Sequence, residues 1–248
     1  MHAYDIALRQ LIGKQWSVYA RAGQSFRLAN VDDNRFMTTL LEPQTAHDQE
    51  VGLDFTAGRT RLRAVVYRIR LNNEILFLPS TMLPPFGGNV NLPPTERKGI
   101  ELDADVALAD SLLLRANYTL AMAKFRHGSF AGVDVSGKNL PLVPRNHVNA
   151  SLTWQPTTRA SLTGRASYVG QQYFENDQSN TFGRTMPAYT VADLIGYYDI
   201  GQWRLGAAVY NLFDRKYFTY GVVSGASYVA YPSAERSFLV SAEYHFGK

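Results

Sequence analysis

The stretch Ser237–Phe246, which reads SFLVSAEYHF, decides the fold class because its apolar and polar residues alternate. A period of two is typical of a β-strand. The apolar face ends in two aromatic residues, and the opposite face carries charge. This pattern predicts a strand with lipid on one side and a water-filled lumen on the other, with the aromatics at the membrane interface. The apolar face consists of Phe238, Val240, Ala242, Tyr244 and Phe246.

The same alternation recurs along the whole chain. Counted with the last stretch, it predicts about eleven strands, which is an odd number. Single-chain bacterial barrels usually have an even number, so the count predicts part of a larger barrel. The other predicted strands are Tyr4–Leu8, Trp16–Ala22, Gln49–Phe55, Arg61–Leu71, Ile100–Leu108, Leu112–Leu120, Val148–Trp154, Leu162–Tyr168, Tyr189–Ile200 and Trp203–Phe213.

The connections between these strands alternate in length. Some are turns of about two to four residues, such as Gly13-Lys14 and Gly201-Gln202, and others are polar loops of about ten to twenty residues. The long loops lie at residues 26–44, 126–144 and 175–186. Short turns at one end and long loops at the other are expected of an outer-membrane barrel. The predicted fold is therefore all-β, an antiparallel transmembrane β-barrel.

Composition narrows the function classes. The net charge of +4 over 248 residues is spread without a basic block, so the sequence predicts no nucleic-acid partner. The chain has no cysteine, which excludes a disulfide framework and a cysteine metal site. No apolar run reaches about eighteen residues, so no transmembrane helix is predicted.

Five stretches of the sequence stand out as motifs. Near the end of the chain are NLFDRKY at Asn211–Tyr217 and YPSAERSFLVSAEYHF at Tyr231–Phe246. Earlier come SFRLANVDD at Ser25–Asp33, LLEPQTAHDQEVGLDF at Leu40–Phe55 and NVNLPPTERKGIELDAD at Asn89–Asp105. Each motif is weak alone, but in this order and spacing they resemble those of TonB-dependent outer-membrane receptors of the siderophore-receptor type.

The resemblance implies a barrel of twenty-two strands around an N-terminal plug, which imports a ferric siderophore or similar chelate with energy passed from TonB. Residues 1–248 then correspond to the C-terminal portion of the barrel, without the plug or the TonB box. The start, MHAYDIALRQLIG, lacks a signal-peptide pattern, so we expect the back part of a longer polypeptide. TonB is then a partner only through the missing plug.

The resemblance also implies that barrel assembly machinery reads the last strand. The residues expected to form this signal are Phe238, Val240, Tyr244 and Phe246. Gly247 and Lys248 follow Phe246, whereas the family's last strand typically ends on the aromatic residue.

Aromatic residues gather in or beside the predicted external loops. One hypothesis is an aromatic ligand mouth, with arginines that pair with an anionic siderophore or chelate. The alternative, favoured for any single aromatic, is an interface girdle and ordinary loop packing. The ligand-binding candidates are Arg126, Tyr173, Phe174, Arg184, Tyr220 and Tyr228.

Other chemistry has weaker support. Glu101, Asp103 and Asp105 line one strand face, and pairing with arginines of neighbouring strands is favoured over a cation site. The histidines have no metal-ligand spacing, and no catalytic motif occurs, so neither a metal, a cofactor nor an enzyme is predicted. An outer-membrane phospholipase or protease would need a Ser/His/acid cluster, and none is visible. A passive outer-membrane porin or channel remains the alternative function.

Overall fold

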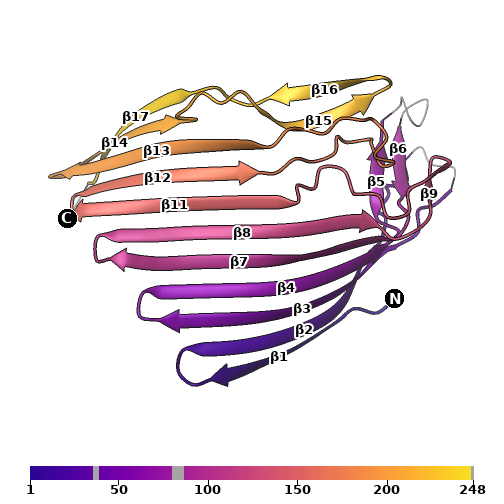
Figure 1. Ribbon diagram of the computed structural model, residues 1–248, viewed down its shortest axis with the longest axis horizontal. Helices are drawn as coiled ribbons and strands as arrows, with labels where there is room; N and C mark the ends of the chain where they lie inside the picture. The colour runs from indigo at the N-terminus through magenta and orange to yellow at the C-terminus, as the bar shows by residue number, and fades with distance from the viewer. Residues whose placement is uncertain (36–38, 80–86, 247–248) are drawn as a thin grey trace.

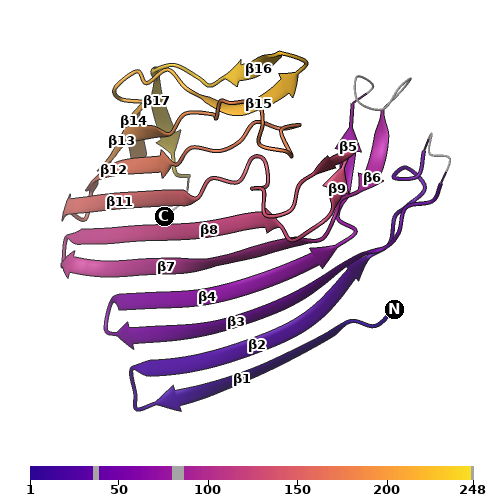
Figure 2. The ribbon, with the colours of Figure 1, turned by 45° about the vertical axis from the view of Figure 1, so that its right-hand side comes forward.

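The computed structural model describes residues 1–35, 39–79 and 87–246, and eleven long strands form one curved sheet (Figures 1 and 2). This confirms the predicted fold class. In sheet order the strands are β1 (Tyr4–Ile12), β2 (Trp16–Arg27), β3 (Gln44–Ala57), β4 (Thr60–Asn72), β7 (Thr95–Ala109), β8 (Leu112–Phe125), β11 (Asn146–Thr157), β12 (Ala160–Val169), β13 (Tyr189–Ile200), β14 (Trp203–Tyr210) and β17 (Ser237–Tyr244).

Each strand pairs antiparallel with its neighbour, and β1 and β17 form the two edges of the sheet. Tight turns join the strands at one end, where the chain also finishes, and the longer connections lie at the other end near the N-terminus (Figure 1). The alternation of connection lengths is therefore confirmed. Several strands are longer than predicted; β7 begins at Thr95 because its period of two continues through charged residues.

The register of the strands separates two faces. Val51, Val66, Ile100 and Leu120 lie side by side on four neighbouring strands. The residues next to them in sequence, which point the other way, include Glu50 and Glu101. The same alternation holds on the other strands of the sheet. One face of the sheet is therefore almost wholly apolar, and the other carries most of the charge. In a membrane the apolar face meets lipid and the polar face lines the lumen.

Three small hairpins stand at the loop end, and the alternation pattern predicted none of them. One lies within residues 126–144, which were predicted to be a polar loop, and the other two lie in stretches for which no strand was predicted. The hairpins pair over four or fewer residues or include aromatic runs without clear alternation, so the period-two pattern did not separate them from loop. They are β5 (Ile75–Leu78) with β6 (Gly88–Asn91), β9 (Ser129–Phe130) with β10 (Val133–Asp134), and β15 (Phe218–Ser224) with β16 (Ser227–Pro232).

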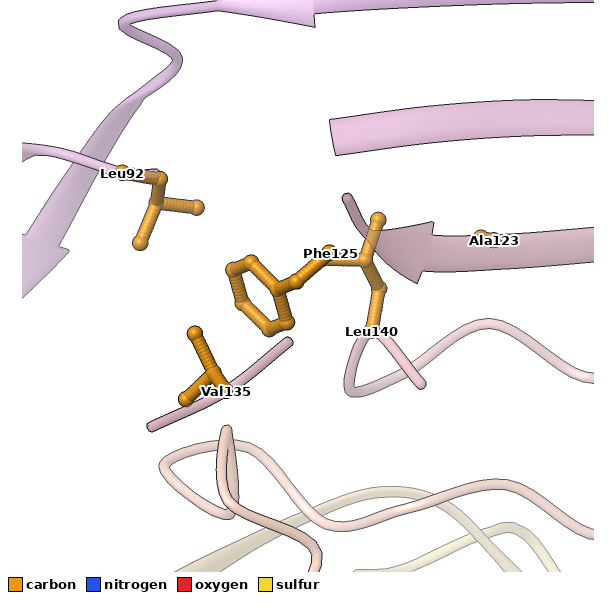
Figure 3. Packing of buried hydrophobic residues seen from close by; sticks show 5 residues of the cluster. All are labelled: Leu92, Ala123, Phe125, Val135 and Leu140. Atoms are coloured by element: carbon orange, nitrogen blue, oxygen red, sulfur yellow. The ribbon is translucent and has the colours of Figure 1, made fainter. Parts of the chain in front are cut away.

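A small hydrophobic core ties the loop after β8 to the sheet. Phe125, at the end of β8, and Val135, in the loop, are at most 1% exposed. Figure 3 shows the Phe125 ring lying close to Leu92, Val135 and Leu140. Backbone bonds join Leu140 N to Ala123 O and Gly137 N to Phe125 O, both at 3.0 Å. The loop at residues 126–145 is therefore packed against the barrel wall.

Aromatic side chains collect at the turn end of the apolar face. The ring centroids of Trp16 and Phe55 lie 4.5 Å apart, and those of Trp203 and Tyr244 lie 5.0 Å apart. Phe246 lies beyond the end of β17, and its ring is 4.7 Å from that of Tyr244. This arrangement is expected of an interface girdle. Gly247 and Lys248 lie outside the described residues.

No helix in the described part of the chain has the length and apolarity needed to cross a membrane.

Candidate functional site

Ion pairs between neighbouring strands cover the polar face. Arg165 Nη2 on β12 lies 3.2 Å from Asp193 Oδ2 on β13, and Arg204 Nε on β14 lies 2.8 Å from Asp199 Oδ1 on β13. Both pairs are substantially exposed, so each contributes little stability alone. Together they make the lumen-facing side of the sheet hydrophilic, so water and polar ligand groups can contact it.

The predicted carboxylate row lies on this wall. Asp105 Oδ1 on β7 is 3.2 Å from Arg115 Nε on the neighbouring strand β8, and Asp103 lies opposite Arg63 in the register. In residues 1–35, 39–79 and 87–246, no three His, Cys, Asp or Glu side chains are arranged to hold a metal ion. These arginine neighbours support the ordinary lumen interpretation of Asp103 and Asp105, whereas Glu101 lies opposite Val65 and Thr119 in the register.

The NLFDRKY motif forms a tight connection after β14. Asn211 has a φ of 49° and is 3% exposed. Its Nδ2 donates to Arg215 O at 2.9 Å and to Ala234 O at 3.2 Å, while its Oδ1 accepts from Arg215 N at 2.8 Å. Asp214 Oδ1 accepts from Arg236 N at 2.9 Å, and this bond lowers the pKa of the Asp214 carboxyl. The motif therefore joins the start of the β15–β16 loop to the entry of β17.

An aromatic cluster packs along the β15–β16 hairpin, from Phe218 at its base to Tyr228 beside its turn. Phe174, which is 1% exposed, lies at its centre, with ring centroids of Tyr228, Phe182 and Phe218 at 4.7, 5.7 and 6.3 Å. Gly221 leaves room for the ring, because a Cβ there would lie 2.8 Å from two ring carbons of Phe174. Phe174 therefore holds the β12–β13 loop against the β15–β16 hairpin, and a ligand could reach its ring only if these two segments moved apart.

Two carboxyl groups, those of Glu175 and Asp177, lie in the loop between β12 and β13 that also carries Phe174. Asp177 is 4% exposed, and its Oδ1 accepts backbone bonds from Thr181 N at 2.9 Å and Phe182 N at 3.3 Å. Burial raises the pKa of the Asp177 carboxyl against these bonds, and burial also raises the pKa of Glu175. Burial therefore disfavours the charged forms of both carboxyl groups in this loop.

The structure brings three of the predicted ligand residues, Phe174, Arg184 and Tyr228, together at this cluster. Arg184 and Tyr228 line one hollow of about 320 Å³ with Phe182, Ala226 and Ser227. A guanidinium and a phenol beside an apolar ring suit an anionic or aromatic ligand group.

A second hollow holds Tyr173. It has a volume of about 420 Å³ and includes Lys124 and Arg145, with amide side chains and no carboxylate among its lining residues. Sequence reasoning did not select Lys124 or Arg145, because one continues a strand pattern and the other follows a proline. The remaining candidates lie elsewhere. The Tyr220 ring is 5.3 Å from that of Tyr231, and Arg126 follows β8, where its backbone nitrogen bonds Pro94 O at 2.7 Å.

A curved antiparallel sheet with one apolar and one charged face, girdled by aromatics at its turn end, defines the wall of an outer-membrane β-barrel. Residues 4–212 match the family model described as TonB dependent receptor-like, beta-barrel. The chain belongs to this family. TonB-dependent receptors are outer-membrane proteins of Gram-negative bacteria and are transporters, not enzymes.

Curated relatives carry siderophore receptor names. The chain is 30% identical over 217 residues to the Ferrioxamine B receptor of Salmonella typhimurium strain LT2, which covers 84% of this chain and 29% of that protein. It is 26% identical over 228 residues to the Catecholate siderophore receptor Fiu of Escherichia coli K12, covering 90% and 29%. The chain thus spans about three tenths of the length of these relatives.

Solved structures share the fold. The siderophore receptor PiuA from Acinetobacter baumannii superposes with a TM-score of 0.76 at 19% identity, covering 97% of this chain and 35% of that one. The copper transporter OprC superposes with a TM-score of 0.77 at 17% identity, covering 98% and 39%. At these identities the likeness concerns the fold alone.

Proposed function

We propose that this chain forms the C-terminal portion of the barrel of a receptor that takes up a ferric siderophore or similar metal chelate with energy from TonB. The observation that carries this proposal is the loop-borne hollow of Arg184 and Tyr228 above a polar barrel wall. A guanidinium and aromatic rings at the external end suit an anionic chelate. The names of the curated relatives support the same substrate class.

Strand direction supports assembly with further strands. Because all neighbours are antiparallel, the first and eleventh strands of the sheet, β1 and β17, run the same way. Direct pairing of β1 with β17 would be parallel, whereas outer-membrane barrels are built from antiparallel strands. An antiparallel barrel that includes this sheet therefore needs an odd number of additional strands. The same geometry gives no support to a passive porin formed by this sheet alone.

Uptake measurements test the proposal. The gene that encodes this chain, with its flanking sequence, is expressed in a strain that lacks its own siderophore receptors. We expect cells to accumulate radioactive iron from at least one hydroxamate or catecholate siderophore, and to stop doing so when TonB is deleted. Uptake that persists without TonB, falls no lower with an uncoupler and rises linearly with ligand concentration would instead indicate a passive channel.

A further inference from the structure

The lipid-facing side of the sheet carries an isolated group of charges. Strand register assigns outward positions on all eleven strands, and fixed charges occupy only five of them. All five lie on the adjacent strands β4, β7 and β8, and four are cations, so the group has a net charge of +3. We call it the outer basic cluster: Arg68, Arg70, Glu96, Lys98 and Lys124.

The register shows that the outer basic cluster is the direct continuation of the apolar face. One row of neighbours across four strands is Val51, Val66, Ile100 and Leu120. Two residues along each strand toward the loop end, the row becomes Gln49, Arg68, Lys98 and Met122, and the next is His47, Arg70, Glu96 and Lys124. The cations therefore stand where the apolar band ends on its external side.

The contacts within the cluster hold the arginines in place without neutralising the group. Glu96 Oε2 accepts from Arg68 Nε at 2.7 Å and from Arg70 Nε at 3.2 Å, and Lys98 Nζ lies 3.9 Å from Glu96 Oε1. One carboxylate thus orders three cations. Lys124 Nζ has no ion pair among the described residues.

The cationic side chains remain accessible in the sheet. The Arg68, Arg70 and Lys98 side chains are 45%, 43% and 54% exposed, whereas Glu96 is only 17% exposed. A ligand approaching from the lipid side therefore meets guanidinium and ammonium groups before it meets the carboxylate. Cations at this depth are costly beside hydrocarbon unless their charged ends reach an anionic partner.

We propose that the outer basic cluster binds the phosphate groups of a phosphorylated glycolipid in the outer leaflet. The position of the cluster indicates a lipid. If acyl chains lie on Val66, Ile100 and Leu120, the head group of that lipid lies beside the next row toward the loop end, which contains Arg68 and Lys98. The charge supplies the selectivity, because arginine and lysine form charge-assisted hydrogen bonds with phosphate oxygens. Of the five side chains only Lys124 also lines the hollow that holds Tyr173, and the other four have no role in the proposed uptake function.

A matched pair of variants tests the proposal. The complete receptor is purified in neutral detergent and titrated with diphosphoryl lipid A, with binding followed by native mass spectrometry. The first variant is Arg68→Gln/Lys98→Gln/Lys124→Gln. The control is Arg61→Gln/Arg63→Gln/Arg115→Gln, which removes the same charge from lumen-facing positions on β4 and β8. Heat-modifiable gel migration shows that each variant is folded.

We expect the first variant to lose roughly tenfold to hundredfold in affinity and the control to change by less than about threefold. Binding of the unaltered receptor should weaken with rising salt, should be weaker for monophosphoryl lipid A, and should not be competed by millimolar inorganic phosphate. Equal losses in both variants, equal binding of a zwitterionic phosphatidylcholine, or salt-independent binding would each overturn the proposal. The salt and lipid comparisons need no variant, so they decide the question even if a variant misfolds.

Discussion

The backbone nitrogen of Asn211 donates a 2.9 Å hydrogen bond to Asp193 Oδ1, and the other oxygen of the same carboxylate lies 3.2 Å from Arg165 Nη2. One aspartate of β13 therefore links the turn after β14 to the charged wall of the lumen. The NLFD stretch thus has a structural role in this chain, because it positions the β15–β16 hairpin, which carries part of the aromatic cluster.

Replacing Asn211 with alanine should destabilise the barrel by about 2–4 kcal/mol, because it leaves buried backbone groups unpaired and removes the amide side chain that offsets the cost of a positive φ at this position. Thermal unfolding in detergent measures the change. Asn73→Ala is the matched control, since Asn73 also has a positive φ of 56° but is less buried. Equal destabilisation by both variants would show that backbone conformation alone decides the effect.

Replacing Phe125 with alanine should release the loop at residues 126–145 from the barrel wall. Loss of a fully buried phenylalanine typically costs about 3–5 kcal/mol, and here the cost falls on one loop. We expect faster trypsin cleavage at Lys138 while the sheet stays folded. Phe77→Ala removes an equally large side chain that is 58% exposed, and it should leave cleavage unchanged.

Replacing Arg184, Tyr228 or Tyr220 with alanine should each weaken binding of the transported chelate, by about tenfold for the arginine because a charge-assisted bond is lost. Equilibrium binding to the complete receptor measures this. Arg59→Ala, on a short turn at the opposite end of the sheet, is the control. Unchanged affinity in all three variants would remove these residues from the ligand site.

The loop at residues 173–186 should be more stable in mild acid. Burial raises the folded-state pKa of Asp177 above its ordinary value of 3.8, so its contribution is fully favourable below that value and is lost as pH rises through the raised pKa. Hydrogen exchange of Thr181 and Phe182, corrected for intrinsic rates, should show greater protection at about pH 4 than at about pH 8. The double variant Glu175→Gln/Asp177→Asn should lose this dependence, and its persistence would assign the effect to other groups.

Replacing Asp105 with asparagine should change barrel stability by less than about 1 kcal/mol, because its pair with Arg115 is solvent-exposed. Chelators should likewise leave stability unchanged. A large chelator-dependent loss of stability that disappears in Asp103→Asn/Asp105→Asn would restore the cation-site interpretation.

Strict alternation determined the fold class from sequence alone. Phe238, Val240 and Tyr244 lie on one face of β17 because side chains of a strand alternate, and no tertiary contact is needed to establish this. The same rule located all eleven sheet strands. The assembly signal assigned to Phe238, Val240, Tyr244 and Phe246 stays a prediction, because the fold places these residues without testing what reads them.

Tertiary structure alone decided the loops and the sites. Phe174 and Tyr228 are 54 positions apart in the sequence, yet their rings are 4.7 Å apart because the β15–β16 hairpin folds onto the earlier loop. Arg68, Lys98 and Lys124 become one cluster only through the register of three strands. The alternation of residues along a strand predicts which face of the sheet a side chain occupies. Which side chains meet depends instead on how distant strands and loops pair and pack, and no local sequence pattern contains this information.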